Sequence, residues 1–132
     1  MMKRFIQTIF MIVALTPFFG VSSVSAASLG GSWSGSGVIQ PIDGQAERAR
    51  CRIVYSKVSE STYKVKAKCA STSGKASQVA TVRPVGKNTY AGSFFNAEHN
   101  TNGDVSITLK GNVQTVSMTS SVGSAKITLK RH

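Results

Sequence analysis

Acidic residues are scarce in this chain: only five of its 132 residues are Asp or Glu, against sixteen Lys and Arg. Acid–base catalysis commonly needs positioned carboxylates, and a serine nucleophile needs a neighbouring base. The five acids fall mostly in expected turns or strand ends, and His99 is the only histidine that could serve as such a base. We therefore expect no enzymatic activity and assign no catalytic residue. The acids are Asp43, Glu47, Glu60, Glu98 and Asp104.

Residues that bind metals or cofactors are also scarce. The two histidines, His99 and His132, do not have the spacing to the two cysteines that metal ligands show. The chain has no CxxC motif for redox chemistry, no Walker loop and no dinucleotide fingerprint. We therefore expect no metal ion and no cofactor.

The first 26 residues have the layout of a secretory signal peptide. Lys3 and Arg4 precede an apolar run over residues 5–21, and small residues at 24–26 match a signal peptidase site. We predict cleavage after Ala26, which makes residues 1–26 a signal peptide and residues 27–132 a single domain. The periplasm is the expected compartment, secretion is the alternative, and no transmembrane segment is expected in the mature chain.

No helix-length segment shows a 3.6-residue period. Short alternating runs are instead separated by Gly, Asn or Pro every 8 to 12 residues or so, as in all-β sandwiches and barrels. Pro84 is expected to end the fourth strand, and residues 100–103 (Asn-Thr-Asn-Gly) are expected to form a turn. Eight strands are expected, at residues 32–40, 46–56, 62–70, 76–83, 89–96, 104–110, 113–119 and 124–131. Their order favours a small antiparallel up-and-down barrel, because closure removes exposed edges.

The two cysteines predict one disulfide, because an exported protein is expected to oxidise such a pair. Cys51 and Cys69 fall on the apolar side of the second and third expected strands. If they lie directly opposite, Arg52 faces Lys68. Large residues at other inward positions, such as Tyr55 and Phe94, indicate a filled barrel or one with a shallow mouth.

Cationic residues alternate with apolar ones in these same two strands. Since alternate residues of a strand point to opposite faces, the cations are expected to form one exposed surface, which we call the cationic face. It comprises Arg48, Arg50, Arg52, Lys64, Lys66 and Lys68. After residue 26 the chain has fourteen Lys and Arg and five acids, a net charge of +9. Such charge predicts attraction to anionic lipid, lipopolysaccharide, acidic polymer or acidic protein, although it could also serve only to keep the protein soluble. Nucleic acid is not expected, because the aromatic residues that would stack on bases fall on the opposite face.

The expected first strand opens with Gly31-Ser32-Trp33, and this G-x-W resembles the calycin group of barrels, which includes lipocalins and avidins. In lipocalins a basic residue near the end of the barrel packs over this tryptophan. The resemblance implies the same role here for Arg131 or Lys130, through a cation–π contact. It also implies the alternative function of holding a small ligand in the barrel.

The size of the chain, the early cysteine pair and the ending Leu129-Lys130-Arg131 resemble the Inh-type periplasmic protease inhibitors. That family inhibits metalloproteases by inserting its N-terminal segment, which corresponds here to residues 27–30. The R-x-R-C-R and Y-x-G-S-F runs are similar to those of uncharacterised small exported proteins of α-proteobacteria, which supports a periplasmic setting.

Overall fold

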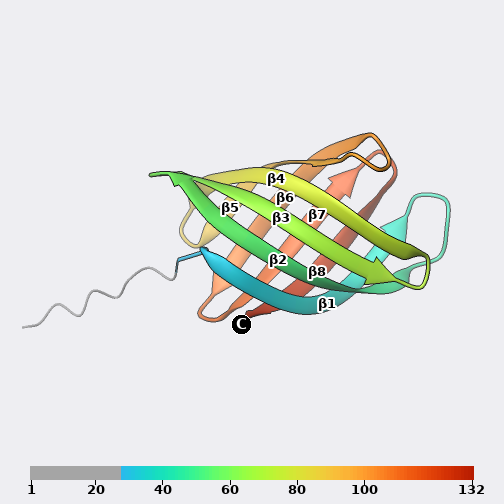
Figure 1. Ribbon diagram of the computed structural model, residues 1–132, viewed down its shortest axis with the longest axis horizontal. Coiled ribbons are helices and arrows are strands. Elements are labelled where there is room, and N and C mark those ends of the chain that lie inside the picture. Colours follow the sequence, from blue (N-terminus) through green and yellow to red (C-terminus); the bar gives the residue numbers. More distant parts are fainter. Residues whose placement is uncertain (1–27) are drawn as a thin grey trace, which may run out of the picture.

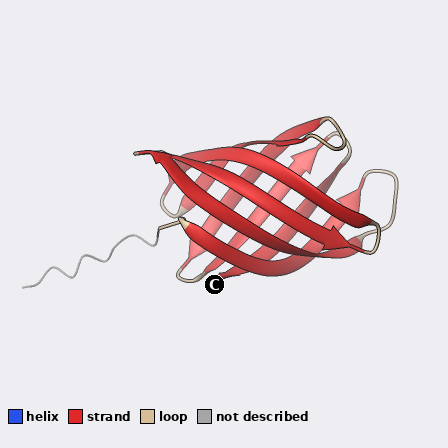
Figure 2. Cartoon of the chain, viewed as in Figure 1, coloured by secondary structure: helices blue, strands red, loops and turns tan. Residues whose placement is uncertain are grey.

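The computed structural model describes residues 28–132, which form eight strands closed into a barrel. Each strand is antiparallel to the next one in the sequence, and the last pairs with the first (Figure 1). All connections within this part of the chain are loops or turns, without a helix (Figure 2). The strands are β1 (Gly31–Pro41), β2 (Glu47–Ser59), β3 (Thr62–Ser71), β4 (Gly74–Gly86), β5 (Thr89–Asn96), β6 (Thr101–Lys110), β7 (Val113–Ser120) and β8 (Gly123–Arg131). The expected eight-stranded antiparallel barrel is confirmed, whereas the expected signal peptide at residues 1–26 lies outside the described residues.

Pro84 does not end the fourth strand. β4 runs on to Gly86, with Pro84 opposite Tyr90 and a shift of register between Pro84 and Gly86. The prediction was wrong because proline, although it cannot donate to a ladder, is tolerated where a bulge interrupts regular pairing.

Residues 100–103 are not a turn either. The turn lies earlier, at residues 97–100, and β6 begins at Thr101, which pairs with Asn96. Gly103 lies inside β6 opposite Phe94, and a Cβ at this position would come within 2.5 Å of the Phe94 ring. The glycine therefore makes room for an inward aromatic side chain, a role that resembles a turn signal in the sequence.

The two ends of the barrel differ. We call the end that holds Trp33 the closed end, and the end formed by the β1–β2, β3–β4, β5–β6 and β7–β8 connections the mouth; the mouth is on the right in Figure 1. Inward side chains form one continuous core between the two ends. The large residues expected inside are buried or packed against this core: Tyr55, Tyr63, Tyr90, Phe94, Ile107, Leu109, Ile127 and Leu129.

Candidate functional site

Trp33 and Arg131 close one end of the barrel. Trp33 is fully buried, and the Arg131 guanidinium carbon lies 4.3 Å from the centroid of its ring. The indole Nε1 donates to the carbonyl of Leu29 at 3.0 Å. Arg131 donates through Nη1 to the carbonyl of Gly30 at 2.7 Å and through Nη2 to the carbonyl of Ser28. The expected basic partner of Trp33 is therefore Arg131.

Lys130 does not share this role. It points outward from β8, is exposed, and lies opposite Ser34 of β1. Because adjacent residues of a strand face opposite sides, only one of the two terminal cations can contact the tryptophan.

The segment that precedes β1 is anchored at the closed end. Leu29 is fully buried in the core, and the hydrogen bonds from Trp33 and Arg131 hold the backbone of residues 28–30. This segment corresponds to the one that Inh-type inhibitors insert into a protease cleft, and here its residues 28–30 are held against the barrel. Ala27 lies outside the described residues.

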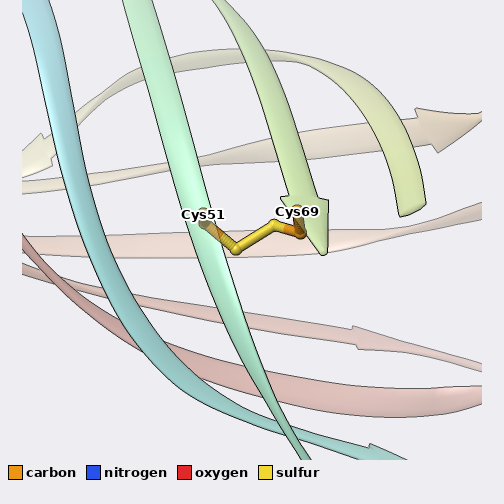
Figure 3. Close-up of a disulfide and its surroundings, with 2 residues drawn as sticks. All are labelled: Cys51 and Cys69. Carbon is orange, nitrogen blue, oxygen red and sulfur yellow. A yellow bond between two sulfur atoms is a disulfide. The ribbon is translucent and has the colours of Figure 1, made fainter. Parts of the chain in front are cut away.

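The disulfide joins β2 and β3 in the expected register. Cys51 lies directly opposite Cys69, with their Cα atoms 4.1 Å apart, and the bridge links the two neighbouring strands (Figure 3). Arg52 faces Lys68, as predicted. The bridge faces inward, so it fixes the register of the same two strands that carry the cationic face outside.

All six residues of the cationic face are exposed on the outside of the barrel. They lie on β2 and β3, which run side by side in the near wall of Figure 1 between β1 and β4. None of the residues paired with them on neighbouring strands is acidic: these are serines, threonine, alanine, valines and, for one pair, another cation. The structure thus places the six residues on one outer surface of the barrel.

A surface groove of about 800 Å³, which we call the basic groove, crosses β1 to β4 within this wall. Four cations line it: Arg50, Arg52, Lys68 and Lys75. No acidic residue is among its lining residues. Lys75 was not expected on this surface, because the expected fourth strand began only at residue 76. In the structure, β4 begins already at Gly74. The outward alternation of Lys75 and Ser77 was the available signal.

The two acids near the mouth end of this wall have neutral partners. A carboxylate oxygen of Glu47 accepts a hydrogen bond from the Ser73 hydroxyl at 2.6 Å. Hydrogen bonds from the hydroxyls of Ser73 and then Ser71 hold the pKa of Glu47 below its ordinary value. Glu98 accepts from the backbone N–H of Ser77 at 2.8 Å.

The mouth holds a second cavity, of about 200 Å³. We call it the mouth pocket. Its wall is mainly apolar and includes Ile39, Met118, Ala125 and Ile127. Phe94 lines both this pocket and a void of about 20 Å³ deeper in the barrel, so it lies between the two spaces. The barrel is therefore filled in its centre and open only at a shallow mouth.

A few polar groups line the mouth pocket. Gln78 Oε1 is buried and has no hydrogen-bond partner among the described residues. Asn96 is also buried, and its Oδ1 accepts from the backbone N–H of His99 at 3.1 Å. His99 itself is exposed at the rim. The pocket therefore offers an apolar wall with one free acceptor.

A buried polar pair lies in the core. The Tyr55 hydroxyl donates to Gln114 Oε1, and burial raises the pKa of Tyr55 above its ordinary value. Gln114 is fully buried and its Nε2 has no partner in the described part of the chain. This pair lies on the inner face, away from the cationic residues.

Residues 28–132 contain no group of three or more His, Cys, Asp or Glu side chains placed to hold a metal ion. The same residues contain no helix with the length and apolar character needed to cross a membrane.

No protein-family model and no curated protein matches the chain. Solved structures do match it. A redesigned β-barrel, mFAP1, bound to DFHBI, is 18% identical, with a TM-score of 0.66 over 78% of this chain and 94% of that one. A de novo designed fluorescence-activating β-barrel is 13% identical, with a TM-score of 0.63 over 81% and 96% of the two chains. Rv2717c from M. tuberculosis is 11% identical, with a TM-score of 0.55 over 79% and 92%. At these identities the likeness is one of fold: the described part of the chain is a small, closed, eight-stranded antiparallel barrel.

Proposed function

We propose that the protein is an exported, non-enzymatic binding protein that engages an anionic partner of the cell envelope through its cationic face. The observation that carries the proposal is the basic groove, where four cations gather on one wall and no acid lines the cavity. Like charges placed directly opposite on neighbouring strands destabilise a sheet, by roughly 0.2–1 kcal/mol per pair. Arg52 and Lys68 form such a pair, and a bound anion would remove the repulsion.

The proposal predicts binding that weakens with salt, because exposed charges are screened over about 8 Å at physiological ionic strength. The exported protein should bind vesicles that contain phosphatidylglycerol, or a heparin-derived oligosaccharide, at low salt and release them at high salt. It should not bind vesicles of phosphatidylcholine alone. Equal binding to neutral and anionic probes would contradict the proposal.

A charge-matched pair of variants tests the location. The first variant replaces four cations of the cationic face by serine: Arg50, Arg52, Lys66 and Lys68. The control replaces four exposed cations near the closed end: Lys57, Arg83, Lys87 and Lys110. Both should remain folded, because exposed substitutions usually change stability by less than about 0.5 kcal/mol each. Only the first variant should lose binding to the anionic probe. Equal loss of binding in both variants would show that binding depends on the net charge of the protein and not on the cationic face.

The mouth pocket supports a second candidate function, the binding of a small apolar ligand. Ligand pockets are typically apolar with a few polar groups that fix orientation, although most are larger than this one, at about 300–1,000 Å³. Ile42 and Val122 are exposed at the rim, where the Ile42 N–H donates to the Val122 carbonyl at 2.9 Å. Among the similar structures, mFAP1 is a barrel that holds DFHBI. A ligand here would be small and would donate a hydrogen bond to Gln78.

Fluorescence of N-phenyl-1-naphthylamine, an uncharged dye, tests this second candidate without involving the cationic face. Ala125→Phe fills the pocket and should abolish the signal, whereas Val85→Phe, at an exposed position, should leave it unchanged. If neither variant alters the signal, the dye does not bind in the pocket. We do not extend the proposal to protease inhibition, because Leu29 of the inhibitory segment is buried.

A further inference from the structure

The six residues of the cationic face divide into two groups according to their neighbours. In one cross-strand row, Arg50 lies between Ser36 of β1 and Ala70 of β3, and Ala70 pairs in turn with Lys75 of β4. These residues line the basic groove. The row has a cation on each side of a small central residue.

The next row has two adjacent cations in its centre and a serine at each edge. Arg52 lies between Ser34 and Lys68, and Lys68 pairs with Ser77 of β4. The small side chains of the two rows form the floor of the groove. They are Ser34 and Ser36 on β1, Ala70 on β3 and Ser77 on β4. Outward residues of successive rows are about 7 Å apart along a strand, and two strand spacings span about 10 Å. Four positive charges therefore lie within an area that two neighbouring phosphate or sulfate groups would cover.

The other three cations lie in different surroundings. Lys66 is flanked by Val54 and Val79, which are both exposed. Lys64 lies between Ser56 and Thr81 and lines a separate surface hollow. Arg48 lies opposite Val38 and does not line the basic groove. These three cations lie outside the basic groove, and none of them pairs directly with another cation.

The chemistry of the groove suits a tetrahedral oxyanion. An arginine guanidinium binds phosphate or sulfate through two parallel N–H donors, and a lysine adds a point charge. Serine hydroxyls on both walls, from β1 and from β4, can donate to further oxygens. Neither nearby acid lines the groove, and the carboxylates of Glu47 and Glu98 accept from hydroxyl or backbone donors.

The shape of the groove favours a polymer chain over a membrane surface as the anionic partner. A bilayer surface is broad and meets protruding side chains, whereas a single chain can also reach the half-buried Ser34 and Ser36 on the β1 side of the groove. The most exposed large apolar residues, Ile42 at 67% and Val85 at 64%, lie outside the groove. Interfacial anchoring would need such residues beside the groove cations, whereas the exposed Val54 and Val79 flank Lys66, outside the groove.

We infer that the basic groove, rather than the cationic face as a whole, is the binding site, and that it holds a polymer chain, other than a nucleic acid, that bears sulfate or phosphate groups. This inference rests on the proposed function and narrows it to four cations and one class of partner.

Two triple variants with the same change of charge test it in the exported protein. The groove variant carries Arg50→Gln, Arg52→Gln and Lys68→Gln, and the control carries Arg48→Gln, Lys64→Gln and Lys66→Gln. Affinity is measured against a heparin-derived oligosaccharide and against inorganic polyphosphate over a range of NaCl concentrations. The groove variant should lose about 100-fold in affinity, as expected for three lost charge-assisted contacts. The slope of log K against log salt should fall by about two. The control should stay within about threefold of the wild type, since its rim charges act mainly through screened attraction.

The outcomes separate the inference from the function on which it rests. Equal losses of affinity in both variants would refute the groove as the binding site and would leave the whole cationic face as the binding surface. If the wild type binds phosphatidylglycerol vesicles but neither polymer, the partner is not a polymer chain, and a membrane surface is favoured instead. No binding to any anionic probe would overturn the proposed function itself.

A single substitution keeps the test independent of folding in the triple variants. Lys75→Gln removes the one groove cation that lies on β4, and Lys87→Gln removes an exposed lysine from the β4–β5 turn. Lys75→Gln should lower affinity for the oligosaccharide about fivefold, whereas Lys87→Gln should have little effect. Equal effects would contradict the groove.

Discussion

The closure of the barrel by Arg131 can be tested by removing its guanidinium. Arg131→Ala deletes the cation–π contact with Trp33 and two hydrogen bonds to the carbonyls of residues 28 and 30. The cation–π contact contributes about 0.5–2 kcal/mol. Each hydrogen bond contributes about 1 kcal/mol net, because water can reach the carbonyls after the change. We expect a loss of about 3 kcal/mol in the free energy of unfolding.

Urea and thermal unfolding followed by tryptophan fluorescence measure this loss directly, since Trp33 is the single tryptophan of the chain. A loss of about 3 kcal/mol should lower Tm by about 15 °C in a domain of this size. Arg131→Lys keeps the charge but not the planar fork, so about half of the loss should remain.

Lys130→Ala is the matched control, because Lys130 is the neighbouring exposed cation on the same strand. It should cost less than about 0.5 kcal/mol. If Arg131→Ala costs no more than Lys130→Ala, the guanidinium does not hold the closed end together and the reasoning is refuted.

Three further predictions follow from the barrel. Reduction of Cys51–Cys69, or its replacement by two serines, should cost about 3 kcal/mol in urea unfolding, and unchanged stability would remove the disulfide as a support of the register. Gly103→Val should cost more than about 3 kcal/mol, because a Cβ there would lie 2.3 Å from the Thr119 carbonyl oxygen and 2.5 Å from the Phe94 ring. Gly103→Val combined with Phe94→Ala should cost less than the sum of the two single changes, since it removes the second of these clashes and leaves the first. The lowered pKa of Glu47 means that its stabilising effect is present above its unfolded pKa of about 4.5 and is lost as pH falls through the folded value, so Glu47→Gln should flatten this part of the stability–pH curve.

The fold could be predicted largely from the alternation of residue types. The alternating cations and apolar residues of β2 and β3 defined two strands, and the pairing of Cys51 with Cys69 set their register correctly. Burial of Trp33 against a terminal cation also followed from sequence, because a G-x-W motif and a basic last strand occurred together. The choice between Lys130 and Arg131 needed the register of β8 against β1.

The features that escaped prediction depend on contacts between distant strands. Gly103 looks like a turn residue until Phe94 is seen opposite it. Lys75 looks like a loop lysine until β4 is seen to begin before it. The basic groove itself arises because Ser34 on β1 and Ala70 on β3 are short where their neighbours are long. The positions of the cations in the sequence do not show which short and long side chains lie next to one another on four paired strands.

A titration of ¹⁵N-labelled protein with a heparin-derived oligosaccharide, followed by amide chemical shifts, tests binding in the basic groove most directly. The account predicts that the largest shifts occur at the groove floor and its β4 wall, at Ser34, Ser36, Ala70, Lys75 and Ser77, and that they vanish at high salt. Shifts spread evenly over the outward residues of β2 and β3, or concentrated at the mouth or at the closed end, would contradict it.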